Sequence, residues 1–155
     1  MKLVSFIGKD TQRFAELMQL FLGNEYRVTQ RAAWVLSYCV EQHPEFIQPY
    51  FKRVIKNLGH STIHNAVKRN TLRFLQDIDI PERFQGLATE HCFRFLLSTD
   101  EPVAIKVFAM TVLANLCVRH PDLKNELRLS IEKQMPYSSA GFKSRGRKIL
   151  MNLNA

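Results

Sequence analysis

Apolar residues recur along this chain at helical spacing, in two segments that flank a proline. The segment before Pro44 gathers its apolar residues toward one side of a helix: Ala33, Trp34, Leu36, Val40. The segment after it has an apolar residue at every fourth position: Phe46, Tyr50, Val54, Leu58. A proline is tolerated in the first turn of a helix, where its missing N–H is not needed. The pattern therefore predicts a helical hairpin whose second helix begins at Pro44.

The hairpin pattern returns with a period of about 38 residues. Columns of apolar residues show the period in the first helices: Leu36, Phe74, Val112, Leu150; Trp34, Leu72, Met110; Val28, Ala66, Ala104, Phe142. The second helices repeat too, with one residue inserted before the last copy: Val54, Cys92, Ile131; Leu58, Leu96, Met135. Prolines mark the predicted turns at Pro44, Pro81 and Pro121. Repeated pairs of helices at this period are typical of an α-solenoid.

The first helices resemble those of the HEAT and armadillo class of repeats. The segment "VTQRAAWVL" places Val28, the pair Ala32 and Ala33, and Leu36 as a HEAT unit does, and "HNAVKRNTLRFL" and "EPVAIKVFAMTVL" are weaker copies. The resemblance covers roughly residues 27–153. It implies an all-α fold, an α-α superhelix (solenoid) of HEAT-like helical hairpins. HEAT units often have Arg directly after the first apolar column, and this chain departs there: Thr29, Val67, Ile105, Lys143.

We expect a single HEAT-like repeat domain over residues 1–155, with about eight helices. Its predicted parts are an N-terminal cap, three repeats and a C-terminal cap helix, at 1–26, 27–63, 64–101, 102–138 and 139–155. Asp10 and Gly23 suit the two ends of the N-terminal cap helix. In the last helix, Arg145, Lys148 and Asn152 are expected to face water. The residues predicted to be almost fully buried are Trp34, Leu36, Val54, Phe74, Leu96 and Val112.

Positive charge is concentrated at the C-terminal end. The chain has a formal net charge of +8, which favours a polyanionic partner. Its densest cluster, the C-terminal basic patch, has no acidic residue beside it: Lys143, Arg145, Arg147, Lys148. Serines and backbone N–H groups at the start of that helix could help to hold phosphate. The alternative interpretation is a solvated outer face.

Equivalent positions of the three second helices also carry cations. Lys56, Arg94 and Lys133 share one repeat position, and Arg53 and His91 lie three residues earlier in their helices. We call these five residues the second-helix ladder. Second helices of HEAT-like solenoids usually line the concave surface, so the ladder is predicted to bind a polyanion or another partner. The alternative is that these positions are simply solvent-facing.

Other chemistry-bearing residues give weak signals. His60 and His64 have a helical metal-ligand spacing, but they lie in a predicted turn with no acidic or cysteine ligand nearby. We predict no catalytic residue, metal or cofactor. Cys39, Cys92 and Cys117 are expected to be buried, reduced thiols of a cytoplasmic protein. No apolar run reaches the roughly 18 residues of a membrane span, and the N-terminus lacks a secretory pattern.

The sequence favours a non-catalytic scaffold that binds another protein or peptide in the groove of a solenoid. No nucleophile with its base, glycine-rich phosphate loop or metal cluster is recognisable, although an enzyme site assembled across repeats is a third hypothesis. The alternative is a binder of DNA or RNA backbones, distantly similar to the DNA alkylation-repeat glycosylases. The resemblance to those glycosylases implies groove tryptophans and an exposed carboxylate. The single tryptophan, Trp34, is instead predicted in the core.

Overall fold

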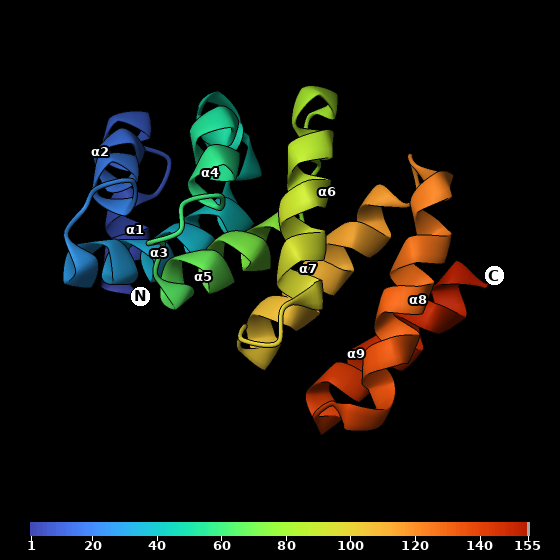
Figure 1. The fold of residues 1–155 in the computed structure, drawn as a ribbon. Coiled ribbons are helices and arrows are strands. Elements are labelled where there is room, and N and C mark those ends of the chain that lie inside the picture. Colours follow the sequence, from blue (N-terminus) through green and yellow to red (C-terminus); the bar gives the residue numbers. More distant parts are fainter. Residues whose placement is uncertain (155) are drawn as a thin grey trace. The chain divides into compact units, whose positions relative to one another are not determined.

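The chain folds entirely into helices, as predicted. A computed structural model describes residues 1–154, and these form nine α-helices and three short 3-10 helices, with no strand among them (Figure 1). The extra helix beyond the expected eight is a short N-terminal one. The chain divides into two compact units, one over residues 1–84 and one from Gln85 onward, and each is described by itself.

The first unit is organised around its longest helix. Its elements are α1 (Lys2–Ile7), α2 (Thr11–Phe21), α3 (Tyr26–Gln42), the 3-10 helix η1 (Pro44–Tyr50), α4 (Phe51–Asn57) and α5 (Asn65–Leu75). Helix α3 packs against α1, α2, η1 and α5. Asp10 begins α2 as predicted, because its Oδ1 accepts hydrogen bonds from the backbone N–H groups of Gln12 and Arg13.

The segment after Pro44 differs from the single α-helix that its spacing predicts. Its first part is the 3-10 helix η1, which contains a second proline, Pro49. A buried helical stripe advances by about 3.6 residues on average, so a uniform step of four drifts away from the buried side. Ile47 and Phe51 are completely buried, whereas Phe46 and Tyr50 are only half-buried. The predicted four-residue stripe is therefore wrong at its start and correct at Val54 and Leu58.

The second unit contains the remaining hairpins. Helix α6 (Glu82–Leu97) spans the division between the units and is followed by α7 (Val103–Leu116), η2 (Pro121–Leu123), α8 (Lys124–Gln134), η3 (Met135–Tyr137) and α9 (Ala140–Leu153). Helix α9 packs against both α7 and α8. The amide of Gln134 donates to the carbonyl of Leu96 at 2.9 Å, which links α8 to α6. Pro81 and Pro121 stand at the predicted turns.

Five of the six residues predicted in the core are buried, and Trp34 is the exception. Leu36, Val54, Phe74, Leu96 and Val112 are each 1% exposed or less, while Trp34 is 46% exposed. Adjacent helical residues point about 100° apart, and on α3 it is Ala33 and Leu36 that face the core. Trp34 lies on the side that the short helix α1 and helix α5 cover only partly. Its repeat equivalents Leu72 and Met110 are buried.

The cysteines behave as the sequence indicates. Cys39, Cys92 and Cys117 are free and buried. Burial raises the pKa of Cys39 to about 11 and that of Cys92 to about 12, and it also raises the pKa of Cys117. Separately, none of the helices within residues 1–154 has the length and apolar character that crossing a membrane requires.

Candidate functional site

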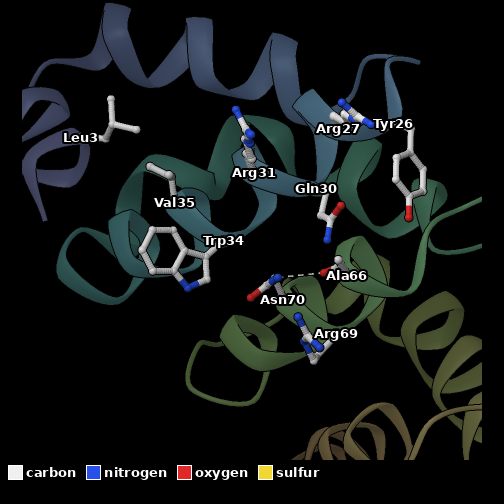
Figure 2. A pocket seen from close by; sticks show the side chains of 10 residues that line it. All are labelled: Leu3, Tyr26, Arg27, Gln30, Arg31, Trp34, Val35, Ala66, Arg69 and Asn70. Carbon is white, nitrogen blue, oxygen red and sulfur yellow. Dashed lines mark hydrogen bonds between the residues drawn. The ribbon is translucent and has the colours of Figure 1, made fainter.

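An open groove of about 600 Å³ lies in the first unit, between α1, α3 and α5 (Figure 2). We call it the first-helix groove, because α3 and α5 are the first helices of two successive repeats. Its lining residues come from α1, α3 and α5 in turn: Leu3; Tyr26, Arg27, Gln30, Arg31, Trp34, Val35; Ala66, Arg69, Asn70.

Helical spacing brings these side chains to one surface. Arg27 and Arg31 are four residues apart, so they lie on one face of α3, and Gln30 and Trp34 form a second such pair. Across the groove, Asn70 is almost fully buried, and its Nδ2 donates to the carbonyl of Ala66 at 2.8 Å. That bond fixes the amide at the base of the groove, where Figure 2 shows it opposite Trp34 and Gln30.

Positive charge dominates the first-helix groove. Arg27, Arg31 and Arg69 line it, and among the residues that the structure describes no acidic one does. Within residues 1–154, none of these three guanidinium groups lies in an ion pair. By contrast, the neighbouring Arg73 lies 3.6 Å from a carboxylate oxygen of Glu41. An arginine is always protonated at physiological pH, so the groove presents three fixed positive charges.

Two aromatic side chains stand in the same groove. Trp34 is 46% exposed and Tyr26 is 57% exposed. The ring of Trp34 meets that of Tyr38 edge-on, with centroids 5.4 Å apart. The ring of Tyr26 meets that of His64 in the same way at 4.3 Å. These contacts hold each ring in place while leaving much of its surface open to a partner.

A smaller, apolar cleft of about 260 Å³ adjoins the first-helix groove. The two cavities share Leu3, Arg31 and Val35 as a common wall. The other residues of the apolar cleft come from α1, α2 and α3: Phe6, Ile7, Arg13, Glu16, Leu17, Leu20, Val28, Ala32. Arg13 is already engaged, because its Nη1 donates to the carbonyl of Phe6 at 2.6 Å and its guanidinium covers the Phe6 ring.

The second-helix ladder lies elsewhere. Arg53 and Lys56 belong to α4, which contributes nothing to the first-helix groove, while Arg94 and Lys133 belong to the second unit. These four side chains are exposed. His91 is only 6% exposed, and its Nδ1 lies 2.9 Å from Nη2 of Arg94. His91 therefore presents little surface to a partner, and the ladder stays a prediction for the other four residues.

One member of the C-terminal basic patch is used inside the second unit. Arg145 is half-buried, and its Nη1 donates to Thr111 Oγ1 at 2.6 Å. The expectation that Arg145 faces water is therefore wrong: α9 packs on α7, and the long side chain reaches the neighbouring helix. Lys143 is half-buried, and Arg147 and Lys148 are exposed.

The residues described by the structure contain no group of three or more His, Cys, Asp or Glu side chains placed to hold a metal ion. His60 and His64 do line one pocket of about 400 Å³. However, Nδ1 of His64 accepts a hydrogen bond from the backbone N–H of Ala66, so this atom caps α5.

Sequence reasoning missed the first-helix groove. The available signal was the repetition of arginine at Arg31 and Arg69, combined with Arg27 one turn before. This signal is easily overlooked, because Trp34 on the same helix falls in an apolar column and is therefore predicted in the core.

Comparison with known families gives a match over almost the whole chain. A family model described as a HEAT repeat domain matches residues 1–153. Neither a curated protein nor a solved structure matches the chain significantly.

Proposed function

Because the chain belongs to the HEAT repeat family, we propose that it is a non-catalytic scaffold that binds a partner protein or peptide through the first-helix groove. Stacked helical repeats present extended surfaces that serve as binding faces. The observation that carries the proposal is the groove itself, in which Trp34 stands exposed beside arginines that form no ion pair within residues 1–154.

An exposed tryptophan that lies next to arginines is typical of a protein interaction site. Tryptophan, tyrosine and arginine are the residues that most often dominate binding energy at protein interfaces. A half-exposed tryptophan leaves a large apolar area in water, and a partner that covers it removes that area from water. The groove lies on the first helices, so this proposal departs from the second-helix surface that the sequence favours.

A photo-crosslinking amino acid in place of Trp34 tests the proposed function. The chain would carry p-benzoylphenylalanine at Trp34 or, as the control, at the exposed Leu129 of α8. After irradiation in cells, we expect a discrete protein adduct from position 34 and not from position 129. The adduct should disappear when Arg31→Glu and Arg69→Glu are added. No adduct at position 34, or the same adducts at both positions, would contradict the proposal.

The second candidate function is binding of a DNA or RNA backbone through the second-helix ladder or the C-terminal basic patch. The net charge of +8 and the exposed Lys56, Arg94 and Lys133 favour it. Replacing those three cations should lower the salt slope of duplex binding by about 2–3. Replacing Lys143, Arg147 and Lys148 instead tests whether the C-terminal basic patch binds the duplex. If the parent chain binds no duplex at low salt, this function is excluded.

We also propose a cytoplasmic location, because three buried cysteines that form no disulfide suit a reducing compartment.

A further inference from the structure

We propose that the first-helix groove binds an acidic segment of a partner protein that also carries apolar side chains. The carboxylates of this segment lie against Arg27, Arg31 and Arg69, and its apolar side chains fill the adjoining apolar cleft. This inference rests on the proposed function and adds the chemistry of the partner.

The charge of the groove indicates the first requirement for the partner, which is acidic side chains. Three guanidinium groups face a cavity with no acidic lining, and none of them has an ion-pair partner within residues 1–154. Arg27 and Arg31 are separated by about 6 Å along the helix axis. Carboxylates four residues apart on a helix have the same spacing, and those two residues apart in an extended segment have nearly the same. Guanidinium groups bind carboxylates through paired hydrogen bonds.

The apolar cleft indicates the second requirement for the partner, which is apolar side chains. Phe6 and Leu20 are exposed on its rim, and Leu17, Ala32 and Val35 form its buried wall. Because Leu3, Arg31 and Val35 line both cavities, the cleft and the groove form one continuous surface. A partner that occupies this surface meets mostly apolar side chains at one end, with Arg13 and Glu16 beside them, and arginines at the other.

This combination favours a peptide over the other polyanions. A nucleic-acid backbone offers phosphates to the arginines but no aliphatic side chains for the cleft. An anionic membrane offers both kinds of group, but on a broad, flat surface, whereas the groove and the cleft are hollows of a few hundred Å³ recessed between helices. An acidic peptide with interspersed apolar residues has the size and both chemical groups.

Trp34 gives this inference its own readout. It is the single tryptophan of the chain, and it stands exposed in the groove. Indole emission moves to shorter wavelength when an apolar group displaces water from the ring. Binding of a peptide without tryptophan should therefore shift the emission of the parent chain.

Selection from random 16-residue peptides by mRNA display tests the partner chemistry. The folded parent chain is the target, and the variant Arg31→Glu/Arg69→Glu serves for counter-selection. We expect the enriched peptides to combine Asp or Glu with Leu, Ile or Phe. Enrichment of apolar peptides without acids, of acidic peptides without apolar residues, or of no peptides would overturn the inference.

Matched variants then place the selected peptide on this surface. By fluorescence anisotropy, Arg31→Glu/Arg69→Glu should raise the Kd at least tenfold, and Leu20→Gln should raise it several-fold. The control Lys9→Glu/Lys52→Glu makes the same charge change at exposed residues of the same unit and should alter the Kd less than twofold. Equal loss of affinity in the charge control would overturn the inference. Tighter binding to single-stranded DNA or to anionic phosphatidylserine vesicles than to the peptide would do so as well.

The failures of the two proposals can be told apart. A protein adduct at position 34 whose contact segment is neither acidic nor displaced by the selected peptide leaves the scaffold function intact and overturns the acidic-segment inference. The absence of both adduct and selected peptides overturns both.

Discussion

The two units carry arginines at equivalent positions of their first helices but use them differently. Arg31 and Arg69 are 38 residues apart, and Arg145 follows 76 residues after Arg69. In the second unit, Arg145 donates a hydrogen bond to Thr111 across α7 and α9. In the first unit, Arg31 and Arg69 line an open groove between α3 and α5 without an ion-pair partner among residues 1–154.

The surroundings of these cations explain the difference. In the second unit, the ammonium group of Lys106 lies 5.7 Å from the centre of the Phe142 ring, and burial lowers its pKa. Arg145 and Lys106 thus take part in the contact between α7 and α9. In the first unit, the equivalent contact leaves Trp34 exposed and the guanidinium groups in water. At this repeat position, the second unit uses its arginine in the packing of its helices, and the first unit presents its arginines to water.

The largest expected effect comes from truncating core side chains, and we expect it to be similar in the two units. Leu36 of α3 and Val112 of α7 share one repeat column and are each 1% exposed or less, so Leu36→Ala and Val112→Ala should each lower the free energy of unfolding by about 2–4 kcal/mol. Urea denaturation measures the change. The exposed Leu129→Ala is the control and should cost less than about 0.5 kcal/mol. A loss that small at both core positions would mean that the repeat register is wrong.

The close packing of the second unit can be broken at Gly146. A Cβ atom there would lie 2.8 Å from Met135 Sδ and 3.0 Å from Ile131 Cγ2. Gly146→Val should therefore cost about 1–3 kcal/mol in thermal or urea unfolding, because α9 would be pushed away from α8. At Gly86 of α6 a Cβ meets nothing within 4 Å. Gly86→Ala should instead stabilise the chain by about 0.5–1 kcal/mol, and equal effects at the two sites would contradict this packing.

The arginine comparison is tested directly by removing the charges. Arg145→Met should lower stability by about 1–2 kcal/mol, because it breaks the hydrogen bond to Thr111. Arg31→Met and Arg69→Met should change stability by less than about 0.5 kcal/mol, since neither side chain has an ion-pair partner within the described chain. A double-mutant cycle with Thr111→Val isolates the Arg145 interaction. A large loss at Arg31 would show that the groove arginines stabilise the fold.

A further effect appears only at high pH and concerns the buried thiols, Cys39 in the first unit and Cys92 in the second. Cys39 and Cys92 have native pKa values of about 11 and about 12, against 9.0 for an unperturbed thiol. The native state thus keeps its thiol protons where the unfolded state loses them. Stability is fully present below pH 9 and should fall as the pH rises above it, by roughly 1 kcal/mol per pH unit for each thiol.

Urea unfolding between pH 8 and pH 10 measures the thiol effect. The parent chain is compared with Cys39→Ala/Cys92→Ala, which removes the two thiols but leaves the other groups that titrate in this range. The variant should lose less stability than the parent between these two pH values. Identical pH slopes would mean that the thiols are not shielded from water.

The sequence determined the helical class, the repeat period and most of the core. The column of Leu36, Phe74 and Val112 could be recognised because each hairpin must bury the same positions against its neighbours, and burial fixes which residues are apolar. The turns could be placed for a similar local reason, since Pro44, Pro81 and Pro121 suit helix starts. The short helix α1 and the 3-10 segment η1 were missed because six or seven residues carry too little periodicity.

Only the tertiary structure decided which side chains of a repeat position are covered. Trp34 and Leu72 occupy the same column, yet Trp34 is exposed and Leu72 is buried. Arg31 and Arg145 also share a repeat position, yet Arg31 is exposed and Arg145 donates a hydrogen bond to a neighbouring helix. Periodicity specifies the direction of a side chain relative to its own helix axis. The presence of a neighbour in that direction depends on the lengths and packing of other helices, and at the first-helix groove the short helix α1 leaves the surface open.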